Sequence, residues 1–526
     1  MTQPEVVCGN SLQPNSHPAG VTMGVTVPSG FPKQAIVVIH GMGEQKPMDT
    51  IKNFAHAVWT ADSEVHENGL RDSGEIWSKP DDRTGSLELR RLTTRESTPI
   101  QEGTYPGGAR QDFYELYWAD LSGGSTLADV QNWVWMLLLR NPFTRVPRRM
   151  MTAWMALWIV VLVILLLVSA AALPAPVPIP PEPEQYDFSL WNYPPYRWLA
   201  PIPGWALAGI VAGLGYVAHT WVVNSFGRVV RYTRALPDNI ASRKAIRERG
   251  LKLLDDLHRA EYDRIIVVGH SLGSLLAYDL LSYYWATHAA SHTVTKTDTD
   301  EFALLCTLEK LAASLATENS PASRKTLLHQ YREAQRAFCR LLRTRSKPAK
   351  KEEPDRRWLI TDLITVGSPL GHTDFLLANS PKDRAERVAA RELATCPPIR
   401  EELDPAVQEA ARADGLPFAG DKPALFSFPT KTTGEWQLHH AAQFAVVRWT
   451  NIHDPARLVA FGDIISAPAA PIFGDGVVDI DLRELRGQSL RFTHTRYWAE
   501  AKRGKQPPPH LVELRTALDL AGKAKL

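Results

Sequence analysis

The chain has 526 residues, of which 44% are hydrophobic and 22% charged, so it can bury one large core or two ordinary ones and is neither disordered nor fibrous. A formal net charge of +2 gives no global case for nucleic-acid binding, and no motif that mixes basic and aromatic residues argues for it. Four cysteines are scattered without a disulfide or metal-binding pattern, which fits a reducing compartment: Cys8, Cys306, Cys339 and Cys396.

A short apolar run, residues 34–39, predicts the first buried strand, and the turn His40-Gly41-Met42-Gly43 follows it. A dinucleotide-binding turn also follows a strand, but it needs a third glycine where Lys46 stands, and no Walker-type sequence occurs. Glycines instead let the main chain approach a ligand, so the Met42 N–H can serve as a donor to a developing oxyanion.

Two long uncharged stretches follow. Residues 154–173 are apolar and long enough to cross a bilayer, and residues 205–223 predict a second span, although this stretch contains glycines and His219. The alternative is a pair of buried core helices, but core helices usually carry a polar face. We therefore expect a two-helix transmembrane hairpin within residues 150–227.

The charges that flank these stretches predict an orientation. Arginines precede the first span and follow the second, whereas the proline-rich connection, residues 174–203, has a single arginine. Positive residues stay on the cytoplasmic side, so both ends of the hairpin are expected there. Residues 1–20 also lack the cationic start and apolar core of a secretory signal peptide.

The most informative motif is Gly269-His270-Ser271-Leu272-Gly273, which lies between an apolar run at residues 265–268 and a helical apolar pattern. This is the arrangement of a nucleophile elbow, in which a serine occupies a sharp strand-to-helix turn. The Leu272 N–H is then a second expected oxyanion donor. A serine that merely caps a helix gives the same local pattern, so the motif needs further support.

A serine hydroxyl needs a histidine base and an acid that orients the histidine. Of the two last histidines, His494 is favoured over His510, which follows three prolines near the tail. Asp454, at the end of an apolar strand, is the expected acid, with Asp463 as the alternative and Asp475 and Asp479 less favoured. His453, His439 and His440 have no spaced cysteines or carboxylates beside them, so no metal site is expected.

These motifs together resemble the α/β-hydrolase superfamily, in particular its lipase- and esterase-like members. The resemblance rests on short segments in the expected order: Ile39-His40-Gly41, Gly269 to Gly273, Thr365 to Gly371, Trp449 to Asp454 and His494 to Trp498. It implies a mostly parallel sheet flanked by helices, split by an insertion because 228 residues (269 − 41) separate the two glycine turns. We expect the hydrolase domain to comprise residues 1–149 and 228–526, with a helical, cap-like insertion at 287–357.

The sequence therefore predicts a membrane-anchored serine hydrolase that cleaves carboxylic esters, with a lipid or other acyl ester as the favoured substrate and no cofactor. Thioester hydrolysis and acyl transfer use the same residues and remain open. A catalytically silent membrane scaffold that keeps the fold is a further alternative. Neither nucleic acid nor a particular protein partner is indicated.

Overall fold

The computed structural model describes residues 33–41, 46–62, 75–94, 110–122, 135–136, 138–143, 151–173, 194–217, 237–260, 262–347, 355–378, 380–416, 424–456, 462–487, 493–500 and 506–520, with a few isolated positions besides. The chain divides into two compact units. The first comprises Met1–Gly41, Gln45–Trp118 and Lys244–Leu526, and the second comprises Met42–Glu44 and Ala119–Arg243. The inserted unit thus has wider bounds than the hairpin expected at residues 150–227.

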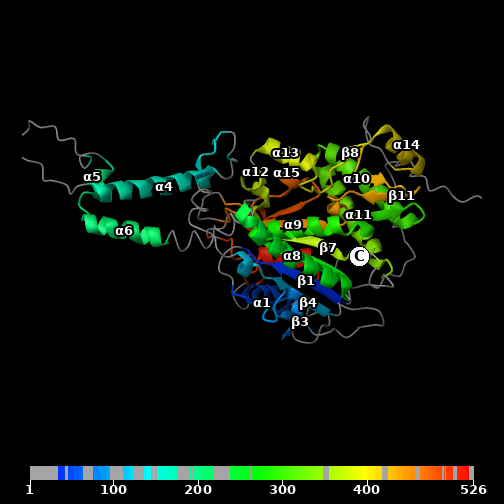
Figure 1. The fold of residues 1–526 in the computed structure, drawn as a ribbon, viewed down its shortest axis with the longest axis horizontal. Coiled ribbons are helices and arrows are strands. Elements are labelled where there is room, and N and C mark those ends of the chain that lie inside the picture. Colours follow the sequence, from blue (N-terminus) through cyan, green and yellow to red (C-terminus); the bar gives the residue numbers. More distant parts are fainter. Residues whose placement is uncertain are drawn as a thin grey trace, which may run out of the picture. The chain divides into compact units, whose positions relative to one another are not determined.

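An eight-stranded sheet forms the centre of the first unit (Figure 1). Its order is β13-β12-β7-β5-β1-β4-β3-β2. The strands are β1 (Lys33–Ile39), β2 (Ile76–Lys79), β3 (Arg91–Thr94), β4 (Arg110–Leu116), β5 (Arg264–His270), β7 (Ile360–Val366), β12 (Arg448–His453) and β13 (Val478–Asp481). The pairs from β4 through β13 are parallel, and only β3 runs against its neighbours. The expected α/β class with a mostly parallel sheet is confirmed.

Helices cover both faces of this sheet. On one face, α1 (Asp49–Ala55) and α17 (Pro509–Leu518) share a buried cluster with alternate residues of the central strands, including Phe54, Leu514, Val38, Val268, Val366 and Ile452. The other face carries α8 (Pro237–Arg259) and α9 (Leu272–Thr287). Every residue of β5, β7 and β12 is buried, which explains why these strands read as continuous apolar runs.

The remaining elements of the first unit are short, apart from two long helices. Those two are α10 (Thr299–Thr317) and α11 (Pro321–Thr344). The others are η1 (His56–Thr60), η2 (Asp82–Thr84), η7 (Ala289–His292), β6 (Thr293–Thr295), η8 (Pro369–His372), α12 (Thr373–Leu376), α13 (Pro381–Ala389), β8 (Glu401–Glu402), α14 (Pro405–Asp414), β9 (Ala424–Leu425), β10 (Ser427–Pro429), β11 (Glu435–Leu438), η9 (Gln443–Ala445), α15 (Ala470–Phe473) and α16 (Leu482–Arg486).

The expected helical insertion at residues 287–357 is present as α10 and α11, but α11 does not form a cap. Tyr331 donates to the Phe444 carbonyl, and Arg332 donates to the Trp449 carbonyl at 2.8 Å. Cys339 contacts the Ile360 carbonyl near the start of β7. These contacts hold α11 along β12 and β7, so it covers the sheet rather than the edge at which Ser271 lies.

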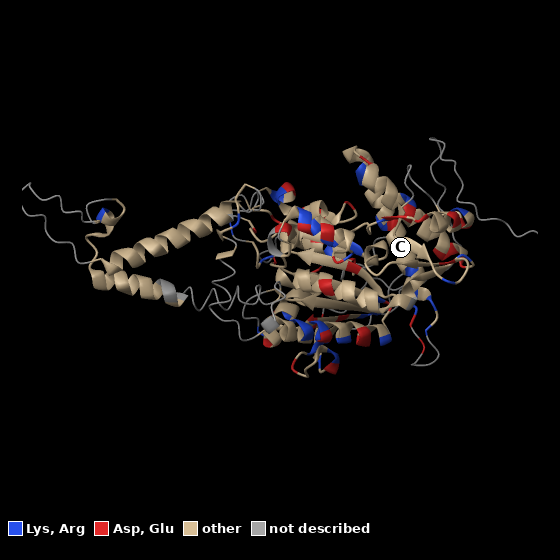
Figure 2. Ribbon diagram, turned by 45° about the horizontal axis from the view of Figure 1, so that its top comes forward, with Lys and Arg blue, Asp and Glu red and all other residues tan. Residues whose placement is uncertain are grey.

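The second unit contains η3 (Ala119–Ser122), α4 (Met151–Ala172), α5 (Tyr196–Leu199) and α6 (Gly204–Val217). Neither α4 nor α6 carries a charged residue (Figure 2). They lie side by side, with Ala170 and Leu207 buried between them. The segment Trp154–Ala172 is long and apolar enough to cross a membrane, and only 6% of it is buried. A single helix of this kind is weak evidence for a membrane span.

The second predicted span has less support. Within the described residues α6 has 14 residues, fewer than the roughly 20 that a bilayer requires, and its apolar stretch is Gly204–Gly213. Residues 218–223 of the predicted span lie outside the described part of the chain, as do residues 174–189 and most of the flanking arginines. The expected two-pass arrangement and its orientation are therefore not supported by the fold.

Candidate active site

Ser271 occupies the turn between β5 and α9 in a backbone conformation that non-glycine residues rarely adopt, with φ 54° and ψ −129°. The turn is closed by a hydrogen bond from the Ser271 N–H to the Val366 carbonyl of the neighbouring strand, at 3.0 Å. Such strain persists only where the surroundings hold it, and it often accompanies function. The Ser271 side chain thus stands at the carboxyl edge of the parallel strands.

Glycines make this turn possible by letting three backbone segments meet. A Cβ atom on Gly273 would lie 2.3 Å from the Ile39 carbonyl oxygen, and one on Gly269 would lie 2.5 Å from the Ser274 Cα. A Cβ on Gly41 would lie 2.7 Å from the Ser271 Cβ. The predicted roles of these glycines in close approach are therefore matched by the backbone geometry, and the Gly41 turn lies directly beside the serine.

The predicted base, His494, lies against this serine. Its Nε2 atom is 2.8 Å from Ser271 Oγ, and its Nδ1 atom is 3.0 Å from Asp463 Oδ2. Because a carboxylate only accepts, Nδ1 carries the proton and Nε2 is left as the acceptor for the serine hydroxyl. All three side chains are buried, with Ser271 only 1% exposed.

Asp463 is held as a carboxylate by several donors. Burial by itself would raise its pKa, but hydrogen bonds from His494 and Tyr497 and the charge interaction with His494 hold the pKa below its usual value. The Ile465 N–H donates to Oδ1 at 2.9 Å, and the Tyr497 hydroxyl donates to Oδ2 at 2.8 Å. The acid is therefore ionised and fixed in direction, as an orienting group must be.

The expected pairing of Asp454 with His494 is not found. Asp454 does follow β12 directly, but its Oδ2 atom accepts from Thr493 Oγ1 at 2.6 Å and forms an ion pair with Arg486 at 2.5 Å. The Asp463 N–H donates to the Asp454 carbonyl at 2.8 Å, so Asp463 also lies at the end of β12. This contact places the alternative acid, Asp463, against the imidazole, so the preference for Asp454 over Asp463 is corrected.

Only one of the two expected oxyanion donors lies in the described residues. Leu272 is the first residue of α9, and its N–H therefore belongs to the unpaired amides of a helix N-terminus next to Ser271. Met42 and Gly43 lie outside the described part of the chain. Just before them, His40 is buried, stacks on Trp118 and accepts from the Trp118 N–H at 3.2 Å. Its Nδ1 atom contacts the Gly41 carbonyl at 2.8 Å, so the ring holds the start of this turn.

Two residues of the site were not singled out from the sequence. The His270 ring donates from Nε2 to the His494 carbonyl at 2.7 Å. Burial and the neighbouring His494 lower the pKa of His270 to about 3, so its ring is neutral. The second is Tyr497, whose hydroxyl contacts both Asp463 and Ser466 Oγ. The position of His270 inside the serine motif and that of Tyr497 three residues after His494 were the available signals.

The other candidate residues serve packing or pairing. His510 contacts the Ala499 carbonyl, and Asp479 caps α15 through the Ala469 and Ala470 N–H groups. Asp475 forms an exposed ion pair with Arg324, and His439 contacts the Ile399 carbonyl. Within the described residues, no group of three or more histidine, cysteine, aspartate or glutamate side chains is arranged to hold a metal ion.

Gly367 and Ser368, within the segment Thr365 to Gly371, adjoin the acid. Gly367 has φ +61°, and a Cβ atom there would lie 2.6 Å from the Tyr497 ring and 3.2 Å from Asp463 Oδ2. The Ala467 N–H contacts the Ser368 carbonyl. This turn therefore packs behind Asp463, which explains why it has no larger residue.

Comparison of the chain with protein-family models, curated proteins and solved structures finds no match. The chemistry that the site can perform therefore follows from the arrangement of its own residues. A serine at a strained turn, an imidazole with one nitrogen on that serine, and an ionised carboxylate on the other nitrogen form the constellation of nucleophilic acyl transfer.

Proposed function

We propose that this protein is a serine hydrolase that cleaves carboxylic esters. The observation that carries the proposal is the chain of hydrogen bonds from Asp463 through His494 to Ser271, at 3.0 Å and 2.8 Å. A buried serine in a structural role needs neither a strained backbone nor an imidazole whose tautomer is fixed by a buried carboxylate.

In the proposed reaction, His494 Nε2 takes the proton of Ser271 while Oγ attacks the ester carbonyl carbon. The Leu272 N–H, with the Met42 N–H as the expected second donor, stabilises the oxyanion of the tetrahedral intermediate. His494 then returns the proton to the leaving alcohol, and an acyl-serine remains. Water attacks this acyl group with His494 as base, which releases the acid and restores Ser271.

The arrangement of the strands supports an α/β-hydrolase fold for the first unit. Ser271 follows the central strand β5, Asp463 follows β12 after a return loop, and His494 follows β13. This is the chain order serine, acid, histidine, with all three residues beyond the carboxyl ends of parallel strands. The inserted second unit separates β4 from β5, as the long spacing between the two glycine turns requires.

We further propose that α4 and α6 form a membrane hairpin that anchors the enzyme on the cytoplasmic side. Support comes from the uncharged surface of both helices and from the exposure of large apolar side chains such as Ile159, Leu165 and Trp205. An apolar face of this extent is costly in water. Resistance of the protein to alkaline extraction from membranes supports the anchor, and a reporter in residues 174–189 that reads cytoplasmic contradicts the topology.

A membrane anchor favours an ester of a lipid or another acylated membrane component as substrate. Thioester hydrolysis and acyl transfer proceed through the same acyl-serine and differ in the leaving group or in the acceptor that attacks. A silent scaffold would keep the fold without turnover.

The test is turnover by detergent-solubilised protein of matched oxyester and thioester pairs with the same acyl chain, with and without a glycerol acceptor. Hydrolysis of the oxyester that is lost in Ser271→Ala supports the esterase. A preference for the thioester or for transfer to glycerol assigns the reaction to one of the alternatives. No turnover of any pair by the folded wild type contradicts the proposal and favours the scaffold.

A further inference from the structure

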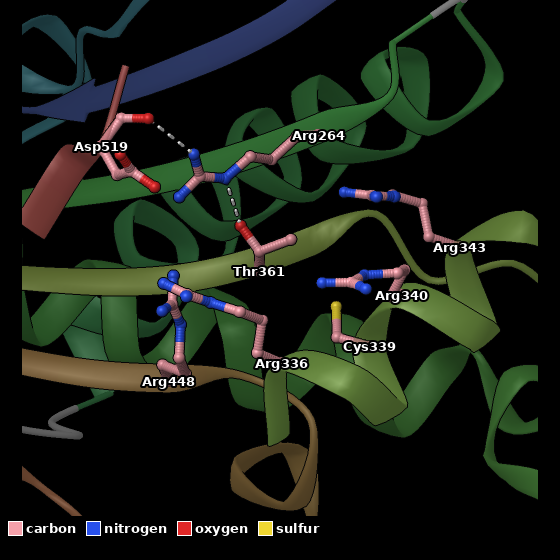
Figure 3. Close-up of a pocket in the computed structure, with 8 residues that line it drawn as sticks. All are labelled: Arg264, Arg336, Cys339, Arg340, Arg343, Thr361, Arg448 and Asp519. Atoms are coloured by element: carbon pink, nitrogen blue, oxygen red, sulfur yellow. Dashed lines mark hydrogen bonds between the residues drawn. The ribbon is translucent and has the colours of Figure 1, made fainter. Parts of the chain in front are cut away.

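Five arginine side chains gather at the edge of the sheet opposite to Ser271, around a small cavity that we call the arginine pocket (Figure 3). It is lined by Arg264, Arg336, Cys339, Arg340, Arg343, Thr361, Arg448 and Asp519. Arg264 and Arg448 are the first residues of β5 and β12, whereas three of the arginines come from α11.

The spacing along α11 brings its arginines together. Positions 336, 340 and 343 are four and three residues apart, so they share one face of the helix. Figure 3 shows the Arg340 and Arg343 side chains extending from the helix toward Arg264 and Thr361, and the Arg336 side chain extending toward Arg448. The guanidinium groups thus converge from one helix and two strands on a single space.

Acidic residues do not balance this charge. Asp362, beneath the pocket, is shared by Arg264 and Arg448, each at 2.6 Å. Asp519 is the only carboxylate in the wall, and its main-chain oxygen accepts from Arg264. Five arginines against these two aspartates leave three positive charges (5 − 2 = +3) before the carboxylates that lie farther out are counted.

Two further carboxylates lie farther out. Glu333 is 3.7 Å from Arg336 but half exposed, and Asp263 interacts electrostatically with Arg343. Arg336 Nε is buried without a hydrogen-bond partner among the described residues, and Arg340 interacts electrostatically with the half-exposed Glu333. Buried donors without acceptors are costly, so this surface favours an additional acceptor.

The lowered pKa values of Arg336 and Arg343 also favour an additional negative group in the pocket. Burial, together with the charges of Arg264 and Arg340, lowers the pKa of Arg343 to about 10. Burial, followed by the charge of Arg448, also lowers the pKa of Arg336. Mutual repulsion of this kind is relieved when an anion enters.

We propose that the arginine pocket binds a phosphate group. Guanidinium groups present paired N–H donors that match the oxygens of phosphate, and their approach from three elements suits a tetrahedral anion better than a planar carboxylate. The ligand is either a free phosphate or the phosphate monoester headgroup of a lipid.

The bound group would not be the substrate of Ser271. Arg264 begins β5 and Ser271 follows its end, and a strand of seven residues spans about 23 Å at roughly 3.3 Å per residue. The proposal is therefore independent of the proposed ester hydrolysis, and it is tested by binding rather than by turnover.

The experiment is isothermal titration calorimetry of the detergent-solubilised full chain with inorganic phosphate at constant ionic strength. The variant Arg336→Gln/Arg340→Gln should bind at least tenfold more weakly than the wild type, while Arg412→Gln on α14 should bind as the wild type does. The single variant Arg340→Gln, which removes one of the five guanidinium groups, serves if the double variant fails to fold. Its melting temperature should equal or exceed that of the wild type.

A second arm distinguishes the two sources. Mixed micelles containing short-chain phosphatidic acid are compared with micelles containing phosphatidylcholine, whose phosphate is a diester. Binding of phosphatidic acid alone, lost in Arg340→Gln, assigns the pocket to a lipid headgroup, and binding of inorganic phosphate assigns it to a free anion. Equal phosphate affinity in all variants, or no binding of either ligand by the wild type, overturns the proposal.

Discussion

Tyr497 and His494 donate to the same oxygen of Asp463. The tyrosine hydroxyl lies 2.8 Å from Oδ2, and His494 Nδ1 lies 3.0 Å from it. The tyrosine therefore fixes the direction of the carboxylate that fixes the imidazole. Removing this hydroxyl leaves the three-residue constellation intact but loosens it.

The variant Tyr497→Phe should reduce kcat roughly tenfold. Losses of this size follow when a group that hydrogen-bonds and orients a functional residue is removed. The pH profile of kcat/KM should also shift, because one donor that keeps Asp463 ionised is lost. The measurement is the full pH profile for wild type and variant. An unchanged profile with a lower melting temperature would mean that Tyr497 serves packing alone.

The two aspartates should differ sharply in their effects. Asp463→Asn should lower kcat by about 10⁴-fold, because an amide favours the wrong imidazole tautomer while preserving the shape of the site. Asp454→Asn should retain turnover and lose stability, since it breaks the buried contact with Arg486. Steady-state kinetics and thermal unfolding of both variants check this pair, and a larger kinetic loss in Asp454→Asn would contradict the assignment.

This pair also shows where prediction from the sequence reached its limit. The strands near residues 34–39 and 265–268 and the turn at Ser271 follow from local apolar runs and glycine spacing, which one segment of chain determines by itself. His494 follows from its place among the last two histidines of the chain. The choice of acid depended on two contacts between distant residues. The Asp463 N–H binds the Asp454 carbonyl, which brings Asp463 to the end of β12, and Arg486, 32 residues away, pairs with the Asp454 carboxylate. Such long-range pairing leaves no local signal.

Glycine at position 273 should be indispensable. A methyl group there would lie 2.3 Å from the Ile39 carbonyl oxygen, and backbone cannot give way as a flexible side chain can. Gly273→Ala should therefore cost at least about 1–3 kcal/mol, the usual range for overpacking, and distort the serine turn. Gly209→Ala on α6, where nothing lies within 4 Å, is the matched control and should keep the wild-type melting temperature. Equal stability of the two variants would contradict the close approach.

Stability should fall as pH drops below about 6.5 through buried neutral histidines. His258 donates from Nδ1 to the Leu254 carbonyl and accepts at Nε2 from the Leu359 N–H, so only the neutral ring fits. Burial, followed by His288, lowers its pKa to about 3. The unfolded chain therefore binds a proton between about pH 6.5 and 3 that the folded chain does not, and stability decreases as pH falls, by about 1.4 kcal/mol per unit.

The check is urea unfolding of wild type and His258→Gln at pH 7, 6 and 5. An amide can donate to Leu254 and accept from Leu359 without titrating, so the variant should lose less stability over this range. Parallel losses in the two proteins would show that His258 is already protonated in the fold.

The central claim is that Ser271 is an activated nucleophile, and covalent labelling tests it most directly. Detergent-solubilised wild type, Ser271→Ala and Ser274→Ala are treated with a fluorophosphonate probe and the labelled residue is identified by mass spectrometry. If Ser271 is the nucleophile, we expect the probe to label Ser271 in the wild type and in Ser274→Ala, and to label nothing in folded Ser271→Ala. No labelling of the folded wild type, or equal labelling of Ser271→Ala, would contradict it.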